Sequence, residues 1–126
     1  MVDSRFDSYA DVLQILRQML LELESGETQL LKQQHTKIQH IFQAHILTTD
    51  IEQLQPLTSS QLQSIHTEMS RELRLLYTEL MFLSTARNQT TVEQRKTQVG
   101  DRLNRLIQYC EFVLQQSQTS NRESDA

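Results

Sequence analysis

Hydrophobic residues recur at spacings of three and four in four stretches of the chain, and polar or turn-forming residues separate these stretches. The first stretch has its apolar positions at Phe6, Tyr9, Leu13, Leu16, Leu20 and Leu23. Such spacing aligns the side chains on one face of an α-helix. The pattern therefore predicts a helix over residues 6–24, and Gly26 is expected to end it because glycine readily adopts the backbone conformation that terminates helices.

The same pattern predicts three further helices, over residues 27–47, 59–87 and 91–116. The apolar face of the second helix carries Leu31, Ile38 and Phe42, and that of the third carries Leu62, Met69, Leu73, Leu76, Leu80 and Leu83. The fourth carries Val92, Val99, Leu103, Leu106, Cys110 and Val113. Thr58 with Gln61, and Thr90 with Glu93, have the spacing of a capping box, so each pair predicts a helix start.

The remaining segments are short. Residues 48–57 are the least helical part of the chain and end near Pro56, although Asp50 is suited to cap a short turn over residues 51–54. Residues 118–126 lack apolar side chains, so they are predicted to form a disordered tail. Gly100 costs about 1 kcal/mol relative to alanine inside a helix. A close helix crossing, a kink and a tolerated surface position are all compatible with it.

The composition favours an all-α protein. Only two glycines and one proline occur among 126 residues, whereas sheets and loop-rich folds need many more turn residues. Four amphipathic helices joined by short links bury their apolar faces best as an up-down-up-down antiparallel four-helix bundle. We expect this bundle to span residues 1–117.

The formal net charge of −4 disfavours nucleic-acid binding, because phosphate backbones attract basic surfaces. Arg95, Lys96, Arg102 and Arg105 would form such a site if one existed. The N-terminal residues lack the pattern of a secretory signal, and no apolar run approaches the length of about 18 residues that a membrane span needs. A single cysteine excludes an internal disulfide. A soluble cytoplasmic protein is expected, with neither a nucleic-acid nor a membrane partner.

Three of the four histidines, His35, His40 and His45, lie close together in the second helix. A helix turns by about 100° per residue, so no two of them point at one metal ion. Neither a His-x-x-x-His nor a Glu-x-x-His pair is present, and no metal site is predicted. His35 and His45 fall on the apolar face and are expected to be partly buried and neutral, whereas His40 is expected to face water.

A degenerate histidine phosphotransfer domain is the competing interpretation, since such domains are small four-helix bundles with one exposed histidine. Its candidate residues are His40 and His66. His40 lacks the lysine and glycine that typically follow the phosphorylated histidine. His66, in IHTEMSREL, is only superficially similar to the start of a histidine-kinase dimerisation helix.

Other catalytic chemistry is not predicted either. The chain has no glycine-rich loop to hold a phosphate group. Cys110 lies on an apolar face, which indicates a small core residue rather than a nucleophile. We therefore expect a non-enzymatic protein with no catalytic residue and no cofactor.

Several apolar residues face away from the predicted core. A helix that is apolar on both sides is usually buried on both sides, and aromatic residues mixed with arginines are enriched at binding hot spots. The outward residues of the third and fourth helices predict a protein-interaction or dimer face made of Leu75, Met81, Phe82, Arg102, Arg105, Tyr109 and Phe112. A homodimer through the third helix is the simplest arrangement, while simple solvation of the two arginines stays an open alternative.

Three stretches, SYADVLQILRQMLLELES, RELRLLYTELMFLSTARN and LNRLIQYCEFVLQ, give the chain a layout that resembles the PatD family of small cyanobacterial proteins, which control heterocyst frequency. With the linker around Pro56 they span most of the chain. The resemblance implies a non-enzymatic regulator of cell differentiation that binds the cell-division protein FtsZ. It assigns no binding residue to a particular position.

Overall fold

The computed structural model describes residues 6–25, 27–48 and 57–125, of which residues 117–125 are described by their backbone only. Four α-helices make up most of this part: α1 (Asp7–Glu22), α2 (Thr28–Ile41), α3 (Ser59–Thr85) and α4 (Gln89–Asp125). A 3₁₀ turn, η2 (Leu23–Ser25), extends α1, and a π-helical turn, η3 (Phe42–Ile46), extends α2. The described residues contain no strand, so the prediction of an all-α protein is confirmed.

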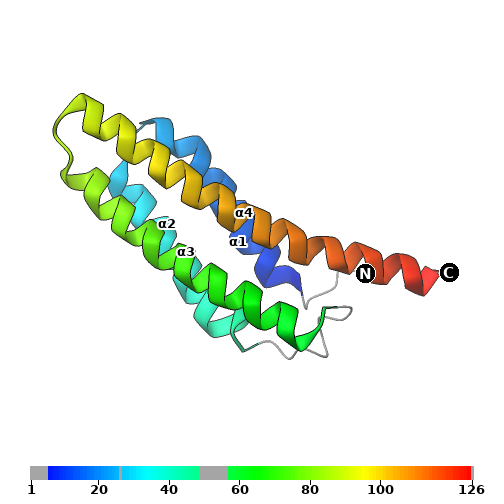
Figure 1. Ribbon diagram of the computed structural model, residues 1–126. Helices are drawn as coiled ribbons and strands as arrows, with labels where there is room; N and C mark the ends of the chain where they lie inside the picture. The colour runs from blue at the N-terminus through cyan, green and yellow to red at the C-terminus, as the bar shows by residue number, and fades with distance from the viewer. Residues whose placement is uncertain (1–5, 26, 49–56, 126) are drawn as a thin grey trace.

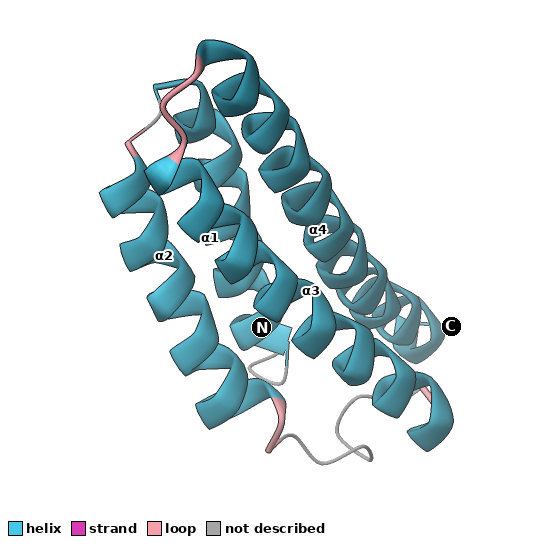
Figure 2. Ribbon diagram, turned by 60° about the vertical axis from the view of Figure 1, so that its left-hand side comes forward, coloured by secondary structure: helices cyan, strands magenta, loops and turns pink. Residues whose placement is uncertain are grey.

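The four helices pack side by side around one core (Figures 1 and 2). α1 lies against α2 and α4, and α3 lies against the same two helices. Each helix therefore has two neighbours, and its two remaining sides face the core and solvent. This arrangement is the expected consequence of burying four amphipathic stripes together.

The core forms from the predicted apolar faces. Its fully buried large side chains come from all four helices and include Tyr9, Leu16, Met19, Leu31, Ile38, Phe42, Met69, Leu73, Leu76, Leu80, Leu103 and Leu106. All six apolar positions predicted for the third helix are buried. In α1 the buried face also includes Val12 and Met19, while Leu20 is only half-buried. α1 is thus rotated slightly from the orientation that its leucine spacing predicts.

The predicted start of α3 is confirmed. The Thr58 hydroxyl accepts a hydrogen bond from the Gln61 amide at 3.1 Å, and the Gln61 side chain accepts one from the Thr58 amide at 2.9 Å. This is the reciprocal capping box that satisfies two free amides of a first helical turn.

The predicted capping box at Thr90 and Glu93 is wrong. The side chain of Asn88 accepts a hydrogen bond from the Thr90 amide at 2.8 Å, and the Val92 amide donates to the Asn88 carbonyl at 2.9 Å. Asn88 therefore caps α4 two residues earlier. Glu93 instead accepts a hydrogen bond from the Gln89 side chain at 2.9 Å, because the two residues lie one helical turn apart.

The prediction that His45 lies on the apolar face is also wrong. The Leu47 amide donates to the Phe42 carbonyl, five residues earlier, at 2.9 Å. This π turn is wider than an α turn, so it shifts the side chains that follow it around the helix axis. Ile46 consequently takes the fully buried position and His45 is exposed.

α4 continues to Asp125 and thus runs through most of the segment that the sequence predicts to be a disordered tail, residues 118–126; the disorder of this segment stays a prediction. No glycine or proline occurs between residues 101 and 126, so nothing in the sequence interrupts the backbone hydrogen bonds of the helix. The end of α4 extends beyond the other three helices (Figure 1). The expected helix stop at Gly26, and the linker turn at residues 51–54 with Asp50 and Pro56, lie outside the described residues.

Candidate functional site

The residues predicted to form an interaction face differ in their exposure. Phe82 is 47% exposed and Phe112 is 41% exposed, which makes them two of the large apolar side chains that contact solvent. Leu75 and Tyr109 are half-buried. The predicted exposure of the aromatic residues on α3 and α4 is therefore confirmed for the two phenylalanines.

One side of α3 faces α4 through residues at spacings of three and four: Glu72, Leu75, Glu79 and Phe82. On α4, the residues that contact this side are Arg95, Arg102 and Arg105, and Tyr109 and Phe112 follow Arg105 at spacings of four and three. We refer to these nine residues as the α3/α4 face. Direct contacts between Glu72 and Arg102, and between Glu79 and Arg95, join its two halves.

Met81 lies on the other flank of α3. It follows Tyr77 by one helical turn, and the Tyr77 ring lies 5.6 Å from the His35 ring of α2, centroid to centroid. Phe82 points the other way, because consecutive helical residues are about 100° apart. Met81 is 39% exposed, but it does not share a surface with the α3/α4 face.

Glu72 is the charged centre of the α3/α4 face. Glu72 is only 2% exposed. The Arg102 Nη1 atom lies 3.2 Å from one carboxylate oxygen and 3.1 Å from the other. A buried carboxylate is tolerated only when it is paired, so this contact explains why an acidic residue can occupy the seam between two helices.

Arg105 adds a second cation to the same carboxylate. Its Nη1 atom lies 3.4 Å from Glu72 Oε1, and 56% of the Arg105 side chain is exposed. Two guanidinium groups thus face one carboxylate, which leaves a local excess of one positive charge. A guanidinium carries five N–H donors, so Arg105 retains donors for an external acceptor.

Phe82 and Arg95 form a second contact across the face. The Arg95 guanidinium carbon lies 4.6 Å from the centre of the Phe82 ring, within the range of a cation–π interaction. Arg95 also contacts the Glu79 carboxylate at 3.4 Å. Arg95, which is fixed by its ion pair with Glu79, therefore holds the exposed Phe82 ring in place.

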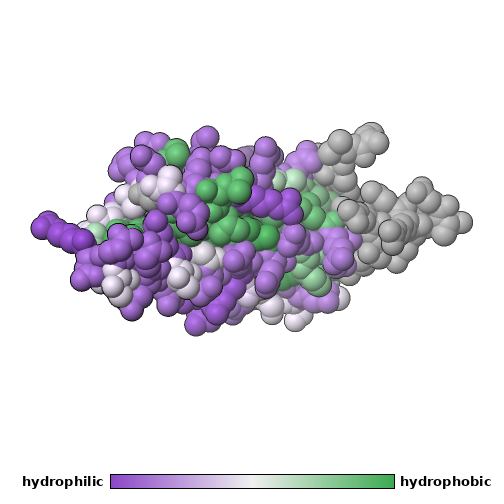
Figure 3. Space-filling view, turned by 90° about the horizontal axis from the view of Figure 1, so that it is seen from above, coloured by the Kyte–Doolittle hydropathy of each residue, from purple (hydrophilic) through white to green (hydrophobic). Residues whose placement is uncertain are grey.

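Phe112 connects the α3/α4 face to a groove between α1 and α4. This groove has a volume of about 600 Å³ and includes Leu13, Arg17 and Glu111 in its lining. Arg17 and Glu111 form an exposed ion pair of 2.9 Å across it. Figure 3 shows this side of the molecule, where apolar side chains form a band through the middle of a polar surface.

The histidines have distinct environments. His35 is 6% exposed and its Nε2 atom donates a hydrogen bond to the Leu73 carbonyl at 2.8 Å. His66 Nε2 lies 2.7 Å from the Tyr9 hydroxyl. Burial lowers the pKa of both histidines, because the charged imidazolium loses water. The prediction for His35 is confirmed, and His40 is exposed as predicted.

Cys110 is fully buried, as its position on the apolar face predicts. Burial raises the pKa of its thiol to about 12. A thiol with such a pKa is almost wholly protonated near neutral pH and is a poor nucleophile.

Sequence reasoning missed Glu72 and Glu79, and it considered Arg95 only for a disfavoured nucleic-acid site. The signal was present, because the two glutamates lie seven residues apart on α3, and Arg95 and Arg102 lie seven apart on α4. Residues seven apart lie two turns apart on one face of a helix. Two such rows of opposite charge on neighbouring helices predict a ladder of ion pairs, provided that the pairing of the helices is known.

The described residues contain no group of three or more His, Cys, Asp or Glu side chains arranged to hold a metal ion. Across the same residues, every helix is too short or too polar to cross a membrane. No protein-family model matches the chain, and neither a curated protein nor a solved structure is similar enough to be recognised as a relative.

Proposed function

We propose that the protein is a non-enzymatic regulatory module that binds another protein through the α3/α4 face. The observation that carries this proposal is the contact between Phe82 and Arg95. It holds a large aromatic side chain at the surface in one orientation. Preorganised aromatic and arginine side chains are the commonest anchors of protein–protein interfaces, because little conformational entropy is lost when they bind.

Arg105 supports the same proposal. The Glu72 carboxylate already contacts Arg102 at 3.1 Å, so the half-exposed Arg105 is not needed to neutralise it. Arg105 retains donors and lies two helical turns from the exposed Phe112, so the two fit a partner that offers a carboxylate and an apolar side chain about 10 Å apart. The face is therefore suited to an acidic and apolar segment.

The proposal includes an up-down-up-down order of the helices and a homodimer. The order is supported by contacts across the bundle, because residue numbers rise along one helix as they fall along its neighbour. Arg95 contacts Glu79, for example, whereas Arg102 contacts Glu72. The homodimer is supported by exposed Phe82 and Phe112, which a second copy would cover in a two-fold arrangement.

The partner comes from resemblance alone. The likeness of the helical stretches to the PatD family makes FtsZ the first partner to test, in a cytoplasmic role that controls how often cells differentiate into heterocysts. A phosphotransfer role for His40 or His66 is the competing function. The hydrogen-bond distance between His66 and Tyr9 disfavours His66 as a phosphate acceptor, since its Nε2 atom is already engaged.

The test is an affinity capture with three immobilised forms of the protein: wild type, Phe82→Glu/Arg105→Glu, and Met81→Glu. Met81 is a matched control, because it is exposed on the same helix but lies outside the α3/α4 face. Purified FtsZ and a native cyanobacterial extract are applied separately. Circular dichroism checks that all three forms are equally helical, and light scattering gives their masses.

We expect wild type and Met81→Glu to capture the same partner protein in equal amounts. The double variant should capture at least about ten times less of it, which is the effect of removing one hot spot. A partner retained equally by all three folded forms would refute the role of the face. Loss of dimer mass alone would show that the face serves self-association. Transfer of a labelled phosphate to the protein that His40→Gln abolishes would favour the phosphotransfer function.

A further inference from the structure

A second surface lies between α2 and α3, on the opposite flank of α3 from the α3/α4 face. It is a groove of about 670 Å³, within the range of about 300–1,000 Å³ that is usual for small-molecule sites. Its lining residues are of polar types, with their carbon atoms forming much of the surface, and come from both sides of the groove: His35, Thr36, Gln39, His40 and Gln43 from α2 and η3, and Ser70, Arg74 and Tyr77 from α3. We refer to it as the α2/α3 groove.

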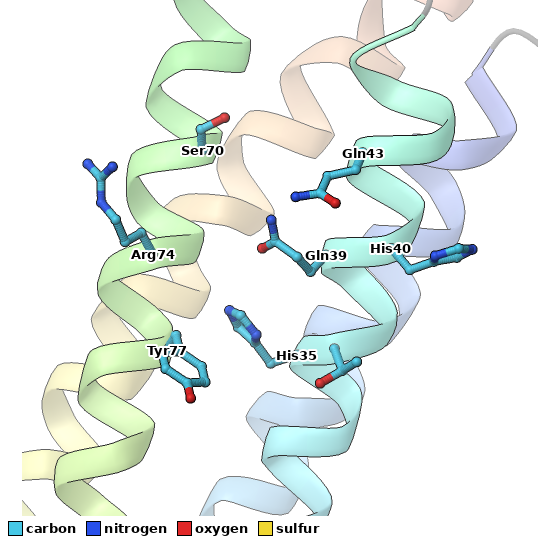
Figure 4. A pocket seen from close by; sticks show the side chains of 8 residues that line it. His35, Gln39, His40, Gln43, Ser70, Arg74 and Tyr77 are labelled. Carbon is cyan, nitrogen blue, oxygen red and sulfur yellow. The ribbon is translucent and has the colours of Figure 1, made fainter.

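Three of the side chains in this groove point toward one another from the two helices, whereas Arg74 extends along the outer side of α3 and His40 points away from α3 (Figure 4). Gln39 and Gln43 extend from α2 and η3 toward α3, and Ser70 extends toward them from α3. Within the described part of the chain, no hydrogen bond is found for the side chains of Gln39, Gln43, Ser70, Arg74 or Tyr77. Two amides and two hydroxyl groups are thus available to a ligand in the groove, and the exposed guanidinium of Arg74 lies at its α3 edge.

The inner wall of the groove is fixed. His35 is buried and its Nε2 atom donates to the Leu73 carbonyl at 2.8 Å, which ties α2 to α3 beneath the groove. The Tyr77 ring rests against His35, with 5.6 Å between ring centroids and 46° between planes. Tyr77 itself is 50% exposed. The groove therefore presents an aromatic ring whose position is set before any ligand binds.

The π turn η3 lies at one end of the groove and supplies Gln43. Such turns interrupt an α-helix at a cost in stability and occur frequently at functional sites. Here the turn contributes Gln43 to the lining, one helical turn after Gln39 of α2. The position of the turn is a second observation, independent of the groove's volume, that points to a binding role.

The charge of the groove limits the ligand. No aspartate or glutamate lines it, and Arg74 is its permanent cation. In the described residues no acidic group forms an ion pair with Arg74, whereas Arg71, three residues earlier, pairs with Glu68 at 3.7 Å. An unpaired guanidinium beside neutral amides and hydroxyl groups favours a carboxylate or a phosphate group.

We propose that the α2/α3 groove binds a small organic anion, with a planar polar body between Tyr77 and the amides of Gln39 and Gln43. Its carboxylate or phosphate group binds Arg74, whose exposed side chain turns toward the groove when the anion binds. Stacking on Tyr77 selects a flat ring. The amides and the Ser70 hydroxyl read polar groups on that ring, since each donates and accepts hydrogen bonds. The proposal does not depend on the function of the α3/α4 face.

The test uses amide NMR spectra of the full-length protein with three probes of similar size. 4-Hydroxybenzoate carries a carboxylate, phenyl phosphate carries a phosphate, and 4-hydroxybenzamide carries neither. Each probe is titrated into wild type, Arg74→Gln and Arg71→Gln, the last being the matched control on the same helix. Both arginines are exposed, so neither substitution is expected to disturb the fold, and the unliganded spectra verify this.

We expect saturable chemical-shift changes at the amides of Gln39, Gln43, Arg74 and Tyr77 with at least one anionic probe. The probe that binds more tightly identifies the preferred anionic group, carboxylate or phosphate. Arg74→Gln and the neutral probe should each weaken binding about tenfold, as expected for loss of one charged hydrogen bond. Arg71→Gln should bind like wild type. Absence of saturation with both anions up to about 10 mM, equal binding by both variants, or shifts centred outside the groove would overturn the proposal.

Discussion

Both carboxylate oxygens of Glu72 on α3 lie within 3.2 Å of the Arg102 Nη1 atom on α4. This contact joins the two longest helices at a point where Glu72 is almost wholly buried. It also fixes Arg102, so that Arg105, one turn along α4 and 56% exposed, is the more accessible of the two cations. One ion pair therefore contributes both to the packing of α3 on α4 and to the charge of the proposed interaction face.

Glu72→Ala should destabilise the fold by about 3–5 kcal/mol, because it leaves the Arg102 guanidinium without its buried partner. The free energy of unfolding is measured by urea denaturation. Glu68→Ala is the matched control, since Glu68 lies one turn earlier on α3, is 42% exposed and contacts Arg71 at 3.7 Å. Loss of that exposed pair should cost less than about 1 kcal/mol.

A double replacement separates the contribution of the Glu72–Arg102 ion pair to stability from the contribution of side-chain packing. Glu72→Met with Arg102→Met removes both charges and keeps apolar volume, so its unfolding free energy should stay within about 1–2 kcal/mol of wild type. If Glu72→Ala costs no more than Glu68→Ala, the Glu72–Arg102 contact does not stabilise the protein.

The protein should lose stability as the pH falls below about 6.5, the ordinary pKa of histidine. Burial lowers the pKa of His35 and His66 in the folded protein. The unfolded chain therefore takes up protons first, and the folded state loses at most about 1.4 kcal/mol per pH unit for each histidine. Above pH 6.5 both states are neutral at these positions and this contribution is constant.

Unfolding free energies at pH 7.5 and pH 5.5 measure this effect. The groups that face these histidines are Tyr77 beside His35 and Tyr9 beside His66, with Cys110 close to Tyr9. A His35→Gln/His66→Gln variant should show a smaller difference between the two pH values, whereas His40→Gln should retain it because His40 is exposed. Equal stability of the wild type at both values would contradict burial of neutral histidines.

Gly100→Ala should stabilise the protein by about 1 kcal/mol, because alanine restricts the unfolded chain and favours a helix. A Cβ atom built on Gly100 would lie 3.6 Å from Leu23 Cδ2, which is ordinary van der Waals contact. The melting temperature should rise by about 4 °C. A lower melting temperature would mean that α4 and η2 approach too closely for a methyl group.

The sequence predicted most of the core, because a leucine spacing of three and four depends only on the geometry of one helix. It could not predict the position of His45. That position depends on the π turn at Phe42, and the local sequence FQAHI carries no signal for a π turn. Asn88 was overlooked as a cap because Thr90 offered a familiar pattern two residues later.

The interaction face was predicted less well than the core. Leu75, Met81 and Phe82 are all apolar and outside the core stripe, but the neighbour that each flank of α3 meets depends on how the helices pair. Once α4 lies beside Glu72 and α2 beside Tyr77, Phe82 and Met81 belong to different surfaces. Periodicity in a single helix gives its buried face, whereas ion pairs such as Glu72–Arg102 require two helices to be placed together.

Hydroxyl-radical footprinting tests the α3/α4 face most directly. Oxidation of Phe82, Phe112 and Tyr77 is measured in dialysed protein, first dilute and alone, then concentrated, and then bound to its captured partner. Phe82 and Tyr77 have similar exposed fractions, 47% and 50%, on opposite flanks of α3. We expect that association protects Phe82 and Phe112 and leaves Tyr77 unchanged. Protection of Tyr77 without Phe82, or no protection of either phenylalanine in a formed complex, would contradict it.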